Sequence, residues 1–218
     1  MTEYVPTICP SILASSEAEY KDQIEKVAGF AHRLHIDITD GKFAPTQTVP
    51  PGQAWWPAGV KADFHLMLKD PLMATKTIVK HKPHLVIIHA EAEGDFKAFA
   101  DFCHDRRVKV GVALLPRTSP QAIAPALPLI DHVLIFSGDL GKFGGHANTS
   151  LTGKIHYLKK HKADLEIGWD GGINTQNISV LASAGVDVFN VGSFIQKADN
   201  PEKAYNDLYR IADETGTT

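Results

Sequence analysis

Residues 85–90 read Leu-Val-Ile-Ile-His-Ala, a run that is apolar except for its histidine, and residues 132–137 read His-Val-Leu-Ile-Phe-Ser. Strands with one solvated face alternate apolar and polar side chains, so near-continuous runs are typical of strands buried on both faces of a parallel sheet. Similar short runs recur along the chain. Together they predict eight strands, at residues 7–13, 33–38, 62–68, 85–90, 109–114, 132–137, 165–170 and 188–193.

Helical patterns lie between these runs. Ser16 and Gly29 bound one such segment, and Asp70-Pro71 opens another that continues to residue 80; the remaining patterns cover 95–107, 174–184 and a last helix from Asn200-Pro201. The strand and helix units recur at about the length of a βαβ unit, roughly 30 residues. This alternation predicts a (β/α)8 TIM barrel that forms a single domain over residues 1–218. A doubly wound sheet would need a glycine-rich turn after the first strand, and PSILASS has no glycine.

The composition limits the partners and the compartment. The 218 residues carry 22 basic and 25 acidic side chains, a formal charge of −3, which argues against nucleic acid and anionic membranes as partners. No apolar run approaches the roughly 20 residues of a membrane-spanning helix. The start MTEYVPTICPSIL lacks the pattern of a signal peptide, and the two cysteines, Cys9 and Cys103, are expected to be buried free thiols. We therefore expect a cytoplasmic protein.

Histidines and carboxylates stand at the ends of three predicted strands. His35 and Asp37 share one face of the second strand, because their positions differ by two. His65 lies in the third strand, and Asp170 ends the seventh. Active sites of (β/α)8 barrels lie at the carboxyl ends of the strands. These four residues are therefore predicted to meet as ligands of one divalent metal ion, and imidazole with carboxylate suits Zn, Fe, Mn or Co.

The role of the His–Asp pair and the roles of two further histidines remain open at this point. A buried His–Asp pair is often only a satisfied hydrogen-bonded pair, and this applies to His35 and Asp37 taken alone. His89 also ends a strand, and it is either a further member of the cluster or a donor behind it. His146 follows a glycine-rich loop and stays a candidate auxiliary, whereas the other seven histidines are expected to be structural or solvated.

Three glycine-bearing loops on neighbouring strands suggest a phosphate site. GKFGGHANTS follows the sixth strand, DGGI ends the seventh, and NVGSF closes the eighth. Glycine lets the backbone approach an anion closely, and barrels often bind phosphate near the ends of strands seven and eight. A small phosphorylated ligand is therefore expected despite the acidic net charge.

These motifs together resemble the ribulose-phosphate 3-epimerase family. The matching segments are CPSILAS (9–15), LHIDITDGKFAP (34–45), DFHLML (63–68), IIHAEA (87–92), GVALLPRT (111–118), FGG (143–145), DGGIN (170–174) and VGSFI (191–195). The resemblance runs nearly end to end and implies a TIM barrel of the ribulose-phosphate binding type. It also implies an isomerase of carbohydrate metabolism, in the pentose phosphate pathway, whose members are commonly dimers or hexamers.

The resemblance assigns roles to individual residues. Asp37 and Asp170 are implied to be the two acid/base catalysts that invert C3 of D-ribulose 5-phosphate to give D-xylulose 5-phosphate through an enediolate. The metal ligands are implied to be His35, Asp37, His65 and Asp170. The substrate-binding residues are implied to be Ser11, His65, Met67, Gly144, Gly145, Gly171, Gly172, Gly192 and Ser193.

The sequence also departs from the family pattern around the expected substrate. Thr39 and Phe136 replace methionines, Thr46 replaces an asparagine, and the loop at residues 138–146 differs from the usual lid. The alternatives are therefore a 3-epimerase of a ketohexose phosphate such as allulose 6-phosphate, or a non-catalytic sugar-phosphate-binding barrel. A decarboxylase of the orotidine-phosphate type is disfavoured, because the third strand carries no lysine beside His65.

Overall fold

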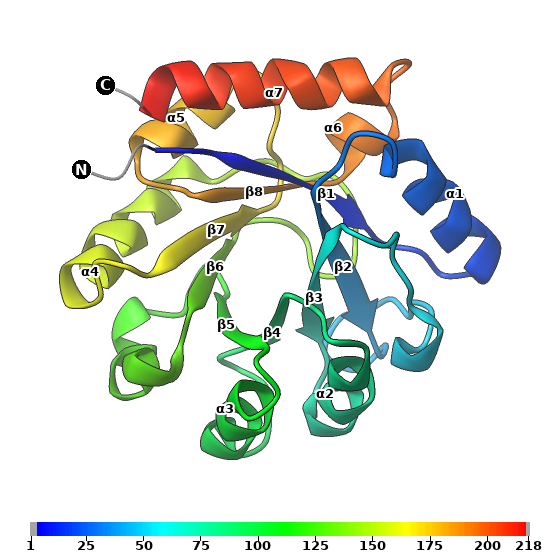
Figure 1. The fold of residues 1–218 in the computed structure, drawn as a ribbon. Coiled ribbons are helices and arrows are strands. Elements are labelled where there is room, and N and C mark those ends of the chain that lie inside the picture. The colour runs from blue at the N-terminus through cyan, green and yellow to red at the C-terminus, as the bar shows by residue number, and fades with distance from the viewer. Residues whose placement is uncertain (1–3, 217–218) are drawn as a thin grey trace.

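Eight parallel strands close into a barrel in the computed structural model, which describes residues 4–216 (Figure 1). The strands pair in chain order, and β8 pairs with β1 to close the ring. Their bounds are β1 Thr7–Ile12, β2 Arg33–Thr39, β3 Lys61–Met67, β4 Leu85–His89, β5 Lys109–Leu114, β6 His132–Phe136, β7 Glu166–Asp170 and β8 Val188–Val191. The predicted (β/α)8 fold is confirmed.

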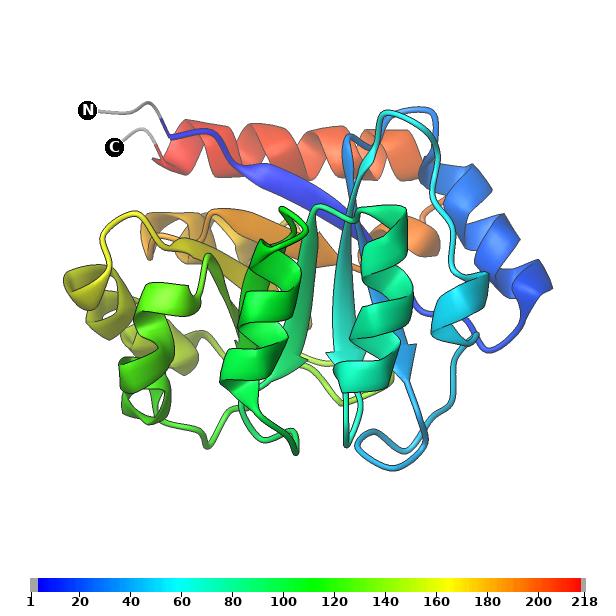
Figure 2. The ribbon, with the colours of Figure 1, turned by 60° about the horizontal axis from the view of Figure 1, so that its bottom comes forward.

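Helices pack around the outside of the barrel, and the loops that follow the strands gather at one end, the lower end in Figure 2. Side-chain caps start two of the helices: Ser16 accepts from the Glu19 amide, and Asp95 accepts from the Ala98 amide. None of the helices in the described part of the chain is both long and apolar enough to cross a membrane. The α-helices are α1 Glu17–Val27, α2 Leu72–Ile78, α3 Phe96–His104, α4 Gly153–His161, α5 Ile178–Ser183, α6 Ser193–Gln196 and α7 Pro201–Gly216.

Two of the crossovers differ from the regular alternation expected from the sequence. The connection from β2 to β3 holds only the short 3-10 helix η1 (Pro51–Gln53), and β5 is followed by the 3-10 helix η3 (Pro120–Leu129). Pro125 and Pro128 lie inside η3. Proline lacks an amide hydrogen and clashes with the preceding turn, so this segment cannot form a regular α-helix. Two further 3-10 turns are η2 (Val79–His81) and η4 (Thr149–Thr152).

The barrel interior has three zones along its axis. A separate apolar cluster of Leu85, Ile87, Ala113 and Leu134 fills the middle. The alternate strand residues point outwards and pack in the main core under the helices. The interior is therefore packed, and the polar residues on the inward face are confined to its two ends.

Charged residues close the end of the barrel where the strands begin. The guanidinium of Arg33 donates to Asp63 over 2.6 Å and to both carboxylate oxygens of Glu166 over 2.9 Å. His132, which starts β6 and is fully buried, lies 2.7 Å from Glu166 through Nδ1. A Cβ at Gly168 would lie only 2.4 Å from the His132 ring, so this position requires glycine. His132 is structural, as expected, although it lies in a strand rather than in a loop.

Candidate active site and metal centre

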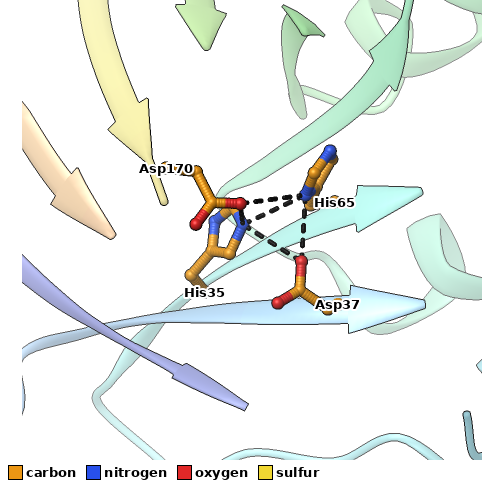
Figure 3. A group of neighbouring side chains, drawn as sticks. All are labelled: His35, Asp37, His65 and Asp170. Carbon is orange, nitrogen blue, oxygen red and sulfur yellow. Dashed lines mark hydrogen bonds and ion pairs between the residues drawn. The ribbon is translucent and has the colours of Figure 1, made fainter. Parts of the chain in front are cut away.

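Four side chains meet at the other end of the barrel, where the strands finish (Figure 3). His35 and Asp37 leave the same face of β2, His65 comes from β3, and Asp170 is the last residue of β7. One ligand-type atom of each residue lies within 4.8 Å of the other three. The convergence expected from the sequence is therefore present.

The spacing of these atoms fits a single metal ion. His35 Nε2 lies 3.3 Å from both His65 Nδ1 and Asp37 Oδ1, and His65 Nδ1 lies 2.9 Å from Asp37 Oδ1. Asp170 Oδ2 lies 3.9 Å and 3.8 Å from the two imidazole nitrogens. Ligands about 2.0–2.1 Å from a tetrahedral zinc are separated by about 3.4 Å, so the four atoms surround a site of the right size. Their role as metal ligands stays a prediction.

The two carboxyl groups have different proton affinities. Burial favours the protonated form of Asp37, but the imidazoles of His35 and His65 outweigh it and hold the pKa of Asp37 at about 2. Burial, reinforced by the negative charge of Asp37, raises the pKa of Asp170 to about 7. Two neighbouring carboxyl groups whose pKa values are pushed apart are suited to different roles in proton transfer.

The two imidazoles also differ. Burial lowers the pKa of His65 to about 3, so this ring is neutral at physiological pH. Burial also acts to lower the pKa of His35, but the charge of Asp37 outweighs it and raises that pKa. Neutral imidazole is the form that binds a metal ion, and His65 is already in that form.

A chain of polar contacts continues from the cluster through His89, the last residue of β4. His65 uses Nδ1 toward Asp37, and its Nε2 lies 2.8 Å from His89 Nε2. On the far side, His89 Nδ1 lies 3.4 Å from Glu91 Oε2. Glu91 itself accepts from the hydroxyl of Thr118 and from the amide of Leu115. His89 therefore lies behind the four-residue group and contacts it only through His65.

A small cavity lies beside the cluster, and most of the predicted substrate-binding residues line it. Its volume is about 30 Å³, room for a water molecule or two. The predicted residues on its wall are Ser11, Asp37, Met67, Gly144, Asp170, Gly171, Gly172, Gly192 and Ser193. Gly145 and His65 are not on this wall: Gly145 lies in the exposed part of the loop, and His65 is buried behind Asp37. The binding roles of all these residues stay predictions.

The loop at residues 138–146 closes over this cavity. Phe143 lies so close to Gly192 that a Cβ there would be 2.5 Å from the phenyl ring. Thr46, in the loop after β2, donates its hydroxyl to the carbonyl of Gly141 over 2.8 Å. Gly138, Asp139, Gly141, Lys142, Phe143 and Gly144 of this loop all lie on the cavity wall. His146 is exposed in this loop, and only its backbone carbonyl has a hydrogen bond to Ser137.

Sequence reasoning missed one polar residue of the cavity wall. Asn190 lies in β8, next to Asp170 in the β7–β8 register. It is 2% exposed, and neither end of its amide has a hydrogen-bond partner among residues 4–216. The available signal was a lone amide in the strand Val-Phe-Asn-Val, which is otherwise apolar.

Comparisons with known sequences match the chain to one enzyme family. Residues 7–196 match the family model described as "Ribulose-phosphate 3 epimerase family". The chain is 33% identical to the ribulose-phosphate 3-epimerase of Mycobacterium leprae, over 95% of each chain. It is 30% identical to that of Bacillus subtilis, over 92% of this chain and 97% of the relative.

Solved structures of other phosphate-handling enzymes share the fold. One is 3-hexulose-6-phosphate synthase from Salmonella typhimurium, with a TM-score of 0.70, 13% identity, and 96% and 99% of the two chains covered. Another is 3-keto-L-gulonate-6-phosphate decarboxylase from Vibrio cholerae, with a TM-score of 0.71, 11% identity, and 96% and 98% covered. The solved structures thus confirm the predicted TIM-barrel fold, and the sequence relatives confirm the predicted isomerase class. From its sequence match over almost its whole length, the chain belongs to the ribulose-phosphate 3-epimerase family.

Proposed function

We propose that the chain is a metal-dependent 3-epimerase of a ketose phosphate, which interconverts D-ribulose 5-phosphate and D-xylulose 5-phosphate. The observation that carries this proposal is the pair of carboxyl groups, Asp37 and Asp170, which line one cavity from β2 and β7. Inverting a carbon requires a base on one face and an acid on the other. A single group cannot reach both faces, so two carboxyl groups are needed.

The donor set of His35, Asp37, His65 and Asp170 suits one divalent cation, drawn from Zn, Fe, Mn and Co. When bound, such a cation supplies positive charge that stabilises an oxyanion developing on the substrate. The buried imidazoles keep Asp37 ionised, so it is suited to accept the proton from C3. Asp170, which holds its own proton more tightly, is suited to return one to the opposite face of the enediolate. The roles exchange in the reverse direction.

The glycine-bearing loops are suited to hold the phosphate. Gly171 and Gly172 have positive φ angles of 111° and 71°, and a Cβ at either would lie 2.1 Å from backbone of the loop opposite. Gly192 and Ser193 come next to them after β8. Backbone amides in such turns bind anions without a basic side chain. Anchoring the phosphate fixes the distance from C3 to both carboxyl groups.

Deuterium exchange at C3 tests the proposed reaction. The metal-replete protein is expected to wash solvent deuterium into C3 of D-ribulose 5-phosphate, measured by NMR, and to form D-xylulose 5-phosphate. Asp37→Asn and Asp170→Asn are each expected to lower the rate by about 10²–10⁴-fold, the usual contribution of a general acid or base. Failure of the wild-type protein to exchange C3 of any ketopentose or ketohexose phosphate contradicts the proposal.

The same assay separates the alternatives. A panel that includes allulose 6-phosphate identifies the ketose phosphate with the highest kcat/KM. A non-catalytic sugar-phosphate-binding barrel would bind the ligand without exchange and keep that response in Asp37→Asn. Elemental analysis of the purified protein identifies the metal, and light scattering determines whether it forms the dimer or hexamer suggested by the resemblance.

A further inference from the structure

Asn190 is a buried amide without a hydrogen bond to any of the described residues. Both Oδ1 and Nδ2 are buried, and neither has a partner in residues 4–216. Buried polar side chains are almost always hydrogen-bonded, and each unsatisfied group costs free energy of folding. Gln23 follows that rule: it accepts from the Leu13 amide and donates to the Leu13 carbonyl and to Glu19. Gln196 follows it at one end, because its Nε2 donates to the carbonyls of Ser11 and Gln23 while its Oε1 has no partner in the described part of the chain. The cost at Asn190 requires an explanation.

The position of Asn190 indicates which kind of group could form hydrogen bonds with its amide. Its side chain lines the cavity at the barrel mouth, together with Ser11, whose buried hydroxyl also lacks a partner in residues 4–216. In the sheet, Asn190 is level with Asp170 on β7. Two residues after Asn190, just past the end of β8, Gly192 begins one of the glycine-bearing segments proposed to hold the phosphate. Asn190 therefore lies between the carboxyl group at the reacting end and the glycine-rich end.

The chemistry of an amide limits which chemical groups of a ligand Asn190 can bind. The carbonyl oxygen accepts hydrogen bonds and the amino group donates two, so the side chain matches a hydroxyl group, which both donates and accepts. An anion would be repelled by Asn190 Oδ1 and by Asp170, and an apolar group would leave both amide ends unsatisfied. Between the reacting C3 and the CH2 group that carries the phosphate, D-ribulose 5-phosphate has one carbon, C4, which bears a hydroxyl.

We infer that Asn190 is a substrate-specificity residue that hydrogen-bonds the sugar hydroxyl on the carbon between the reacting carbon and the phosphate. This inference rests on the proposed function for the orientation of the sugar. In D-ribulose 5-phosphate the hydroxyl is the one on C4. In the free protein the amide of Asn190 is unpaired, and the hydroxyl of the bound sugar forms the missing hydrogen bonds. A sugar without that hydroxyl cannot form them.

The first measurement is the thermal stability of the unliganded protein. Asn190→Leu keeps the shape of the side chain and removes only polar atoms that have no protein partner. We expect its melting temperature to rise by about 2–6 °C, since an unsatisfied group is lost. The matched control, Gln23→Met, loses three hydrogen bonds and is expected to melt at a lower temperature. Asn190→Val, a residue well suited to a central strand, provides a second variant.

The second measurement is the affinity of the metal-replete protein for sugar and for inorganic phosphate. We expect Asn190→Leu to weaken binding of D-ribulose 5-phosphate by about 10-fold or more, seen by calorimetry and in KM, because hydrogen bonds to the hydroxyl are lost. Affinity for inorganic phosphate should stay within twofold. The 4-deoxy analogue should bind the wild type and the variant equally, because it lacks the hydroxyl that Asn190 recognises.

The outcomes separate this inference from the proposed function. A melting temperature of Asn190→Leu and Asn190→Val as low as that of Gln23→Met, or unchanged affinity for the sugar phosphate, overturns the role of Asn190. A variant that still prefers the substrate over its 4-deoxy analogue by the same factor as the wild type overturns it as well. A wild-type protein that binds the sugar through Asn190 but exchanges no deuterium contradicts the epimerase and leaves the role of Asn190 supported.

Discussion

Asp170 determines how the proposed metal site should respond to pH. Burial and the charge of Asp37 raise its pKa to about 7, so below that pH the carboxyl group holds a proton that a metal ion must displace. We expect the apparent metal affinity to fall by about tenfold or more for each pH unit below 7, because the imidazole of His35, whose pKa is also raised, must lose a proton as well. Competition with a chromophoric chelator at pH 6, 7 and 8 measures this. An affinity that rises as the pH falls would contradict the assignment.

His89 is expected to act on the metal through His65. If Nδ1 of His65 faces the cluster, its Nε2 must carry the proton and donate to His89 Nε2 across 2.8 Å. That contact requires the proton of His89 to be on Nδ1, which faces Glu91 at 3.4 Å. We therefore expect the contact with His89 to favour the tautomer of His65 that binds a metal ion.

Replacing His89 tests this chain of contacts. We expect His89→Leu to lower metal affinity by about 10–100-fold, the usual effect of losing a residue that orients a ligand. His89→Gln, which can still accept from His65 Nε2, is expected to recover part of the loss. Chelator competition on the metal-free protein gives the affinities without an activity assay. Equal affinities for the wild type and His89→Leu would show that His65 is oriented without it.

At the scale of single elements, the loop at residues 138–146 controls entry to the cavity. Gly141 has a positive φ of 69°, and a Cβ there would overlap the Thr46 hydroxyl at 2.0 Å. The hydrogen bond from Thr46 to the Gly141 carbonyl joins this loop to the loop after β2. The closed conformation thus depends on a contact between two loops that are distant in sequence.

Thr46→Val removes this hydrogen bond and keeps the shape of the side chain. A single neutral hydrogen bond contributes about 0.5–1.5 kcal/mol, so the open form should become up to about tenfold more populated. Lys142 lies exposed in the loop, and trypsin should cleave after it correspondingly faster. Thr77→Val, which loses a comparable bond inside α2, serves as the control and should leave cleavage at Lys142 unchanged. Equal cleavage rates in all three proteins would show that the hydrogen bond from Thr46 to Gly141 does not hold the loop closed.

How much the sequence could predict also differs between elements. Strands such as LVIIH were identified because burial on both faces gives a continuous apolar run, and His35, Asp37, His65 and Asp170 were identified because strand ends in a barrel share one edge. The 3-10 segment η3 was not located, since its prolines leave no helical signal. Asn190 and the contact of Phe143 with Gly192 depend on which side chains meet across the barrel mouth, and spacing in the sequence does not determine this.

At the scale of the whole molecule, the chain separates stability and chemistry between the two ends of one barrel. The mouth holds an unsatisfied amide and two carboxyl groups in contact with two imidazoles. The opposite end holds a charge network in which Arg33 joins Asp63 and Glu166, and Asp63 Oδ1 and His132 Nε2 in it have no hydrogen-bond partner in the described part of the chain. The apolar cluster of Leu85, Ile87, Ala113 and Leu134 lies between them. The two ends thus carry different polar contacts: ion pairs join the strands at one end, and groups suited to a ligand gather at the other.

Replacing Glu166 tests this difference between the two ends of the barrel, because the residue lies far from the mouth and joins β7 to β2 and β6. Burial acts to raise the pKa of Glu166, but His132 and Arg33 outweigh it and hold that pKa well below its usual range. A depressed folded-state pKa contributes stability that is present above the unfolded value of 4.5 and is lost as the pH falls below it.

We expect Glu166→Gln to lower the free energy of unfolding at pH 7 by about 2–3 kcal/mol, less than for a fully buried ion pair because Glu166 is partly exposed. In urea titrations, the difference from the wild type should shrink as the pH is lowered from 5 to 3, and metal affinity at pH 7 should not change. A difference that is constant over this pH range would mean that the carboxylate charge does not stabilise the barrel.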